Sequence, residues 1–176
     1  VSVTAAAASE VSFVPDPSSA LPGETANVSI WLDSTEGVFS FDAEIHFDPA
    51  VVNITDASAG DFPMGFGMGH YGNYVILGGV TSDFNDKPAG HWLIANLTLK
   101  AESAGTSPLN FNPSKTYLGN QNGKRVPATW NNGTFTCGEV SPGICCLCCL
   151  DCPPGTPCEY NPEIHTQEEC TAAGGL

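Results

Sequence analysis

Four polar side chains recur at every second position of the segment Phe39–Asp48, and they are the first group that could do chemistry. They are Asp42, Glu44, His46 and Asp48. Alternate residues of a β-strand point to the same side and lie about 7 Å apart, so these four groups would share one strand face. Oxygen ligands without a nearby base could bind Ca²⁺ or a basic partner. A solvated sheet face explains the same row, and we prefer that interpretation.

A second polar cluster predicts a calcium site in a loop. Asp83, Asn85 and Asp86 bring three oxygen ligands close together in the sequence, and Ca²⁺ prefers such ligands. Pro88 stands where a helix-flanked calcium loop needs glycine, so this would not be a loop of the common helix-loop-helix type. A solvated loop is the alternative, and no other cofactor is expected.

Catalytic motifs are missing from the sequence. A glycosidase needs two carboxylates about 5–10 Å apart in a cleft, but nothing marks out one pair among the 19 acidic residues. There is no Gly-x-Ser-x-Gly elbow, no His-Glu-x-x-His and no phosphate-binding loop, and the four histidines are scattered singly. We therefore expect that the protein is not an enzyme.

All cysteines of the chain fall in its last forty residues. They are Cys137, Cys145, Cys146, Cys148, Cys149, Cys152, Cys158 and Cys170. A short stretch with few large apolar residues and so many cysteines is typical of a module held by disulfides. The connectivity stays open, because sequence does not reveal it. Three Cys-x-x-Cys spacings would also suit a bound metal, but the signs of export favour disulfides.

Export is predicted from the cysteines together with the glycosylation sequons and the N-terminus. The four sequons are at Asn27, Asn53, Asn96 and Asn132, on the solvent side of expected strands or near strand ends. The segment Val1–Ser9 lacks the charged start and apolar centre of a signal peptide, and looks like the end left after one was removed. No apolar run of about 18 residues could insert into a membrane. We expect an extracellular or cell-surface glycoprotein.

The charge of the chain excludes two classes of partner. Nineteen acidic residues stand against five basic ones, which gives a net charge of -14, and the first 86 residues contain no Lys or Arg. Nucleic acids and anionic membranes are bound by clustered cations, so neither is an expected partner. Cations, basic proteins and neutral glycans remain possible.

Apolar residues alternate with period two and are interrupted by turn residues, a pattern that predicts an all-β sandwich. In the clearest strand, Phe39–Asp48, the odd-numbered residues from Phe39 to Phe47 would face the core. Turns are expected at Gly78-Gly79 and at Asn122-Gly123, which is the strongest hairpin signal. The other expected strands lie around Val11 and Phe13 and over Ala26–Leu32, Tyr74–Val80, Trp92–Lys100, Pro108–Phe111, Val126–Trp130 and Gly133–Thr136.

Two segments of the chain could make contacts with other molecules. Met64, Phe66 and Met68 alternate with glycines in what reads as a flexible loop; such a loop would form an interface or cover the rim of its own sandwich. Val1 and Val3 alternate into the small residues Ala5 and Ala7, in an arm that could add as a strand to a neighbour's sheet. A flexible terminus is the alternative for the arm.

These features divide the chain into an arm (1–9), a sandwich (10–136) and a cysteine-rich module (137–176). The sandwich resembles cohesin domains. The segment Phe39–Phe62, FSFDAEIHFDPAVVNITDASAGDF, has the alternating strand, the Phe-Asp-Pro and the Gly-Asp-Phe of that family. Leu21-Pro22-Gly23-Glu24-Thr25 looks like the family's turn before its second strand, and Leu93–Ala101 and Asn132–Thr136 look like its closing half. The similarity is greatest to cohesin-like modules of archaeal and bacterial surface proteins.

The resemblance implies a nine-stranded jelly-roll sandwich, followed here by the disulfide-rich tail, and a role in protein-to-protein attachment. Our leading hypothesis is a structural protein that assembles with itself into a homopolymer, an extracellular filament or surface layer. The first alternative is a cohesin that binds a dockerin-like protein in a cell-surface or polysaccharide-degrading complex. The second alternative is a carbohydrate-binding sandwich, which predicts Trp31, Trp92 and Trp130 aligned on one exposed face.

Overall fold

This computed structural model describes residues 8–138 of the chain, which contain thirteen β-strands. These residues contain no helix that could cross a membrane. The strands are β1 (Ser9–Val14), β2 (Ser18–Ala20), β3 (Thr25–Ser34), β4 (Ser40–His46), β5 (Val52–Ala59), β6 (Met64–His70), β7 (Tyr74–Val80), β8 (Gly90–Ala101), β9 (Gly105–Phe111), β10 (Tyr117–Gly119), β11 (Arg125–Val126), β12 (Ala128–Trp130) and β13 (Gly133–Cys137).

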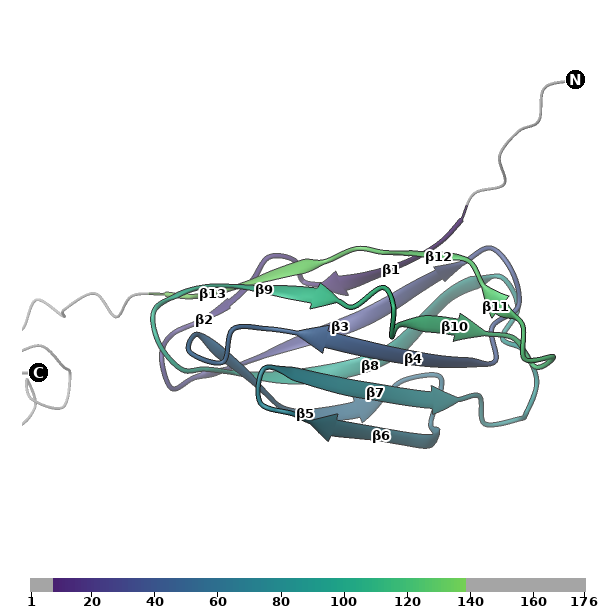
Figure 1. The fold of residues 1–176 in the computed structure, drawn as a ribbon, viewed down its shortest axis with the longest axis horizontal. Helices are drawn as coiled ribbons and strands as arrows, with labels where there is room; N and C mark the ends of the chain where they lie inside the picture. The colour runs from purple at the N-terminus through teal and green to yellow at the C-terminus, as the bar shows by residue number, and fades with distance from the viewer. Residues whose placement is uncertain (1–7, 139–176) are drawn as a thin grey trace, which may run out of the picture. The chain divides into compact units, whose positions relative to one another are not determined.

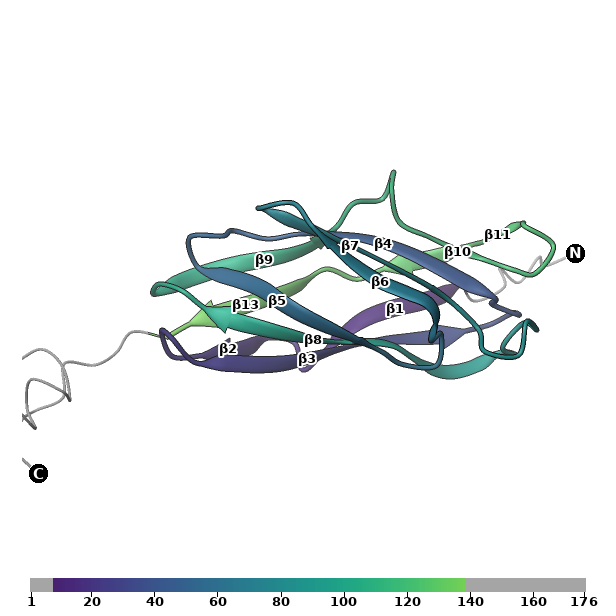
Figure 2. The same cartoon turned by 90° about the horizontal axis from the view of Figure 1, so that it is seen from below.

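The strands form two sheets packed face to face (Figures 1 and 2), which confirms the predicted all-β sandwich. The five-stranded sheet has the order β12-β1-β3-β8-β5. In the eight-stranded sheet, β4 is central: β7 and then β6 lie on one side of it, and β10 and β9 pair with different parts of its other side. Strand β6 therefore ends this sheet on the side where β5 ends the other one.

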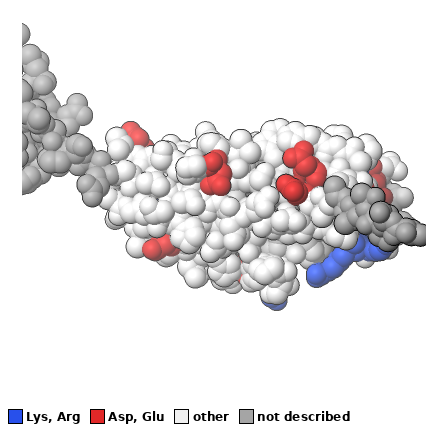
Figure 3. Space-filling view, turned by 90° about the horizontal axis from the view of Figure 1, so that it is seen from above, with Lys and Arg blue, Asp and Glu red and all other residues white. Residues whose placement is uncertain are grey.

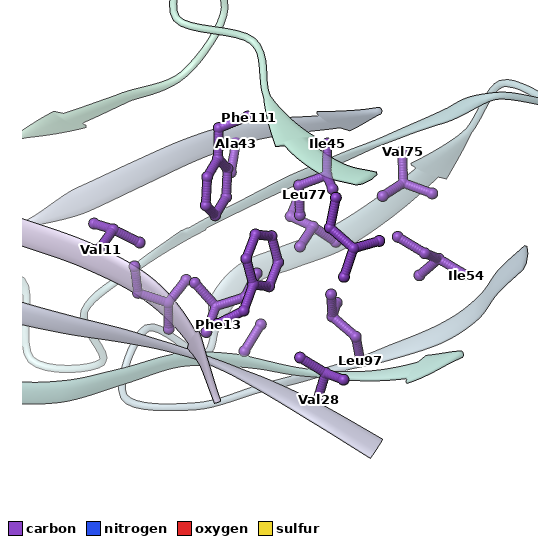
Figure 4. Packing of buried hydrophobic residues seen from close by; sticks show 14 of the residues in the cluster. Val11, Phe13, Val28, Ala43, Ile45, Ile54, Val75, Leu77, Leu97 and Phe111 are labelled. Carbon is purple, nitrogen blue, oxygen red and sulfur yellow. The ribbon is translucent and has the colours of Figure 1, made fainter. Parts of the chain in front are cut away.

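The core lies between the sheets and consists of the alternate apolar residues that the sequence pattern predicts. On β4, Phe41, Ala43 and Ile45 are at most 1 % exposed. The rings of Phe13 and Phe111 stack across the core with centroids 4.6 Å apart, amid aliphatic side chains from both sheets (Figure 4). Phe39 differs from the prediction, because it precedes β4 and is only half-buried.

Three local predictions fail, each for a physical reason. Gly78-Gly79 is not a turn but lies inside β7, where close packing against Phe62 leaves no space for a side chain at position 79. The expected strand Val126–Trp130 is divided by Pro127, which has no N–H to donate to a ladder. The expected loop around Met64–Met68 is strand β6, paired with β7. In contrast, the hairpin at Asn122-Gly123 is confirmed: it joins β10 to β11, and Gly123 has a φ of 72°.

The last strand extends past the expected end of the sandwich at Thr136. Cys137 ends β13 and is 2 % exposed, as part of the core. The other seven cysteines and the arm residues Val1 and Val3 lie outside the described residues. The cysteine-rich module and the arm therefore stay predictions.

The loop between β7 and β8 contains a strained position. Phe84 has a φ of 57° and its side chain is 63 % exposed. A left-handed conformation costs a residue with a bulky side chain about 1 kcal/mol, whereas asparagine adopts it more readily. Phe84→Asn is therefore expected to raise the free energy of unfolding by about 1 kcal/mol, measured by urea denaturation. The control Ser82→Asn, in the same exposed loop, should change it little; a loss of stability in Phe84→Asn would contradict the assignment of strain.

Candidate interaction face

The outer surface of the eight-stranded sheet carries an unusual set of residues where β6, β7 and β4 lie side by side. The pairing register places small or neutral groups opposite one another across β6 and β7, with polar groups on β4. We call this surface the glycine-aromatic face. It consists of Met64, Gly67 and Gly69 of β6, Tyr71 of the β6–β7 turn, Tyr74, Ile76, Gly78 and Val80 of β7, and Asp42, Glu44 and His46 of β4.

The glycines of this face differ in how much space lies above them. Gly67 pairs with Gly78, and a Cβ atom built on Gly67 would meet nothing within 4 Å. A Cβ atom on Gly78 would lie 3.0 Å from an Asp42 carboxylate oxygen, and one on Gly69 would lie 2.9 Å from the ring of Tyr71. The surface is therefore open at Gly67 and covered by side chains at Gly69 and Gly78.

Three rings form a row across one end of the face. Tyr71 stacks on Tyr74 with centroids 5.0 Å apart, and Tyr74 stacks on His46 at 5.1 Å. Tyr71 is 55 % exposed. Aromatic side chains that keep an exposed surface are typical anchors of protein interfaces.

Glu44 of β4 is buried, which corrects the prediction of a fully solvated row. The residue is 9 % exposed, and His46 Nε2 and the donor Nδ2 of Asn112 lie 2.8 and 2.6 Å from its Oε1. The segment after β9 brings Asn112 over β4, where Thr116 Oγ1 also accepts the backbone N–H of Glu44. Asp48, the fourth member of the expected row, lies beyond the end of β4.

The partners of Glu44 keep its carboxyl group ionised. Hydrogen bonds from His46 and then Asn112 lower its pKa below the ordinary value; burial opposes them, and the positive charges of His46 and Lys115 assist. Beside it, hydrogen bonding to Asp42 and the charge of that carboxylate raise the pKa of the Tyr117 phenol. The acidic groups of this face are thus held by neighbours within the sandwich.

The hairpin formed by β6 and β7 is free of charge in an otherwise acidic protein. No Asp, Glu, Lys or Arg occurs between Phe62 and Ser82, whereas the whole chain carries a net charge of -14. Figure 3 shows the opposite edge of the sandwich, seen from above Figure 1: acidic side chains are spaced along it, and the larger of the visible basic areas lies toward one end. The hairpin therefore offers a neutral surface.

Strand β6 contains Met64, Phe66 and Met68, the three apolar residues for which the sequence predicted an interface or a cover for the sandwich rim. Phe66 and Met68 are half-buried and pack against the core, with Phe66 lying 6.4 Å from the ring of Phe41. Met64 pairs with Val80 and belongs to the glycine-aromatic face. Phe66 and Met68 thus help to cover the rim of the sandwich, and the interface role of these three residues stays a prediction.

Three of the four sequons lie on the outer surface of the other sheet. Asn27 and Asn96 are on the adjacent strands β3 and β8, and Asn53 is on β5. The hydroxyl of Thr98 donates to Asn27 Oδ1 (3.4 Å) and that of Ser29 to Asn96 Oδ1 (2.7 Å). Both bonds use the oxygen, not the nitrogen to which a glycan would be attached.

At the two remaining sequons, Asn53 and Asn132, the side-chain oxygen also makes the hydrogen bond. Asn53 Oδ1 lies 2.7 Å from His70 Nε2, and Asn132 Oδ1 accepts the backbone N–H of Phe111 at 2.9 Å. Asn132 lies in the connection between β12 and β13. Glycosylation at the four sites stays a prediction.

Comparison with known proteins finds similar solved structures. No protein-family model matches the sequence, and no curated protein does. A cohesin from Clostridium acetobutylicum, solved in solution, is similar with a TM-score of 0.66 and 18 % identity, over 77 % of this chain and 94 % of that one. A non-cellulosomal cohesin from the hyperthermophilic archaeon Archaeoglobus fulgidus gives a TM-score of 0.63 and 16 % identity, over 76 % and 93 %. The described residues have a cohesin-like fold.

A third similar structure contains a partner. It is a type I cohesin-dockerin complex from Clostridium thermocellum, with a TM-score of 0.64 and 13 % identity, over 80 % of this chain and 99 % of that one. These matches confirm the predicted resemblance at the level of the fold.

The tryptophans of the cohesin-like domain do not form the aligned platform that carbohydrate binding predicts. Trp31 lies on the outer surface of β3, stacked on His91 at 4.4 Å. Trp92 and Trp130 pack against the core. The three rings therefore do not share one face.

A shallow cavity of about 270 Å³ is a second place where a ligand could bind to the cohesin-like domain. The guanidinium of Arg125 lies 4.8 Å from the ring of Tyr117 at this cavity. Its volume is near the lower limit of small-molecule sites. It is lined by Pro113, Thr116, Tyr117, Arg125, Val126, Pro127, Ala128 and Trp130.

The predicted calcium ligands are engaged in local hydrogen bonds. The backbone N–H and side-chain Nδ2 of Asn85 donate to Asp83, and Asp86 Oδ1 accepts the N–H of Gln121 at 2.7 Å. Within residues 8–138, no three His, Cys, Asp or Glu side chains are grouped so that they could hold a metal. The calcium site, which includes Asn85, stays a prediction.

Cys137 is the one cysteine within the described part of the cohesin-like domain, where it is a buried free thiol. Burial raises its pKa, so the less reactive thiol form is favoured. The disulfides predicted for the cysteine-rich module depend on residues outside this part, and they stay a prediction.

Proposed function

We propose that this protein is a non-catalytic attachment module that assembles with copies of itself outside the cell, as the repeating subunit of a filament or surface layer. The contact is made by the glycine-aromatic face and the adjoining edge of β6. The partner is a second copy of the chain.

The neutral β6–β7 hairpin is the observation that carries this proposal. Two copies of a chain with a net charge of -14 repel each other wherever their acidic surfaces meet. The segment from Phe62 to Ser82 carries no Asp, Glu, Lys or Arg, so contacts made there avoid that repulsion. The exposed ring of Tyr71 and the half-buried Ile76 supply apolar area that a partner can cover.

The distribution of sequons also favours a contact on the eight-stranded sheet. Asn27, Asn53 and Asn96 lie on the outer surface of the five-stranded sheet. Glycans on them would cover that surface, since each is bulky and hydrated. No sequon lies on β6, β7 or β4, so the outer surface of these strands is left for protein contacts, although Asn53 comes close to the His70 end of β6.

A charge placed on each sheet in turn tests the proposal. Ile76→Lys puts an ammonium group in the middle of the glycine-aromatic face and should weaken self-association at least tenfold, a change of about 1.4 kcal/mol, because the charge would lose its water at the contact. The matched control is Ser58→Lys, at an exposed position of β5 on the other sheet. Sedimentation over a range of concentrations measures both.

The two variants show which of the two sheets makes the contact between copies. Assembly is expected to persist in Ser58→Lys and to fall in Ile76→Lys, while circular dichroism shows both to be folded. Equal loss in the two variants would place the contact elsewhere, and a wild-type chain that remains monomeric at high concentration would reject the proposal.

A dockerin-like partner is the second candidate, because solved structures with the same fold include cohesin-dockerin complexes. The same surface would then receive a different protein. Immobilised chain that retains a dockerin, and loses it in Ile76→Lys but not in Ser58→Lys, would support this alternative. Self-assembly without dockerin binding supports the leading proposal.

A further inference from the structure

Sheet edges in this domain differ in how they are protected against pairing with another chain. An edge strand exposes unpaired N–H and C=O groups, and proteins usually guard it by short length, charge, proline or a bulge. Strand β2 has three residues between Pro17 and Pro22, and β11 has two residues, one of them Arg125. Strand β12 has three residues after Pro127. These three edges are short and guarded.

The two long edges are β5 and β6. Strand β5 is bulged between Ile54 and Asp56, and the exposed carboxylate of Asp56 adds a charge. Strand β6 has seven residues without charge or proline, and its only guard is an irregularity between Met64 and Gly67. From Gly67 to His70 it pairs regularly with β7. Among the described strands, β6 is therefore the edge that is most open to a further strand.

The side chains along β6 suit an added strand. A Cβ atom on Gly67 would meet no atom within 4 Å, so nothing blocks approach from the outer surface there. On the inner side, Phe66 and Met68 pack against the core but stay half-exposed, and a neighbouring strand would cover the remainder. Strand β5 approaches at one end, where Asn53 Oδ1 lies 2.7 Å from His70 Nε2. Figure 2 shows both edges from below.

We propose that β6 is the acceptor edge for residues 1–8 of the N-terminal arm of a second copy. The sequence VSVTAAAA contains no charged side chain, so it can pair with the neutral β6 of an acidic neighbour without repulsion. In an extended arm, Val1 and Val3 lie on one side and Ser2 and Thr4 on the other. The valines match the half-exposed Phe66 and Met68, and the small polar residues match the glycine side of β6.

This inference rests on the proposed self-assembly. It adds that β6 is the acceptor edge and that the arm is the donor strand. The arm lies immediately before β1, which begins at Ser9. An arm that leaves its own subunit and completes the sheet of the next one links copies head to tail, an arrangement that builds an open filament rather than a closed pair.

Gly67→Lys tests the acceptor edge in the full chain. The site has room for a side chain in the folded subunit, and a lysine at an edge is a common guard against strand addition. The substitution also reduces the net negative charge, so any loss of assembly does not come from greater overall repulsion. Gly67→Ala and Ser103→Lys, which adds the same charge in an exposed loop, are the controls. Val3→Asp tests the donor arm.

Sedimentation and hydrogen exchange read out the result. Gly67→Lys and Val3→Asp should each weaken assembly at least tenfold, and the controls should assemble like the wild type. Backbone amides of β6 should exchange at least tenfold more slowly in assembled chains than in dilute ones.

Each other outcome has a separate meaning. Assembly of Gly67→Lys at the wild-type level, or β6 amides that exchange at the monomer rate within assemblies, overturns the acceptor edge and leaves self-assembly standing. Normal assembly of Val3→Asp overturns the arm as donor. A wild-type chain that never assembles overturns both this inference and the proposed function.

Discussion

Gly79→Ala is expected to lower the free energy of unfolding by about 3 kcal/mol. The added Cβ atom would lie 2.4 Å from the backbone oxygen of Phe62 and 3.1 Å from the ring of Phe41. Phe41 and Phe62 are both at most 1 % exposed, and a backbone oxygen cannot rotate aside as a side chain can. The strand must therefore shift, which would disturb the pairing of β7 with both β4 and β6. Thermal unfolding should show a midpoint lower by about 10 °C.

Gly67→Ala is the matched control on the neighbouring strand. Gly67 pairs with Gly78 next to Gly79, but the space above it is empty. The same methyl group should therefore change stability by less than about 0.5 kcal/mol. Equal effects of the two substitutions would show that glycine matters here through the flexibility of the chain and not through packing.

The strands that alternate strictly could be predicted from the sequence. Phe41, Ala43 and Ile45 occupy the inner positions of β4 as expected, and Tyr74–Val80 was predicted with the bounds that the structure gives β7. Each of these strands buries one face against the opposite sheet, so the spacing of its apolar residues shows which residues face the core.

Strands whose period is broken were missed. In β5 a bulge between Ile54 and Asp56 changes the phase, so that Ala57 faces inward after Ile54. Strand β6 was missed for another reason: its apolar residues do alternate, but with three glycines, whose low β-propensity makes the local sequence read as a loop. Pairing with β7 stabilises β6 as a strand, and that long-range contribution is not visible in local propensity.

The surroundings of Glu44 could not be predicted either. Its acceptor oxygen is reached by Asn112, which is 68 positions away in the sequence. The period of β4 correctly places Glu44 on the outer side, but it cannot reveal that the segment after β9 folds over that position. Topology, and not strand pattern, converts an exposed row into a buried carboxylate between a histidine and an amide.

The same topology links the neutral edge to the polar centre of the face. Strand β4 holds Asp42 and Glu44 within the sheet, where Tyr117, His46 and Asn112 satisfy them. Strands β6 and β7, farther out, have no charged residue to satisfy. An incoming partner would thus meet apolar groups and glycine backbone first, and the acids of this face would remain paired within their own subunit.

Glu44→Ala is expected to lower the free energy of unfolding by about 2 kcal/mol at pH 7. The substitution removes the acceptor that lies 2.6 Å from Asn112 Nδ2 and 2.8 Å from His46 Nε2. The half-buried Asn112 would lose the acceptor of its Nδ2 donor, and an unsatisfied covered donor costs more than the bond itself contributed. The His46 ring, whose side chain is 39 % exposed, can bond to water instead. Asp48→Ala is the control: this exposed carboxylate accepts only a local hydrogen bond from the N–H of Ala50 within the described hydrogen bonds. Urea denaturation measures both, and equal losses would contradict a special role for Glu44.

The pH dependence of Glu44→Gln separates the charge of this group from its packing. The folded state lowers the pKa of Glu44 below its ordinary value of about 4.5, so folding favours the ionised form. That contribution is fully present above the ordinary pKa and is lost as the pH falls through the lower pKa of the folded state. Glutamine has the same shape and no charge to lose. The stability advantage of wild type over Glu44→Gln should therefore be present above about pH 4.5 and should shrink steadily below it. Urea midpoints across this range test it, since the other carboxylates are common to both proteins and cancel. A difference that is the same at pH 7 and in acid would mean that Glu44 acts through its shape alone.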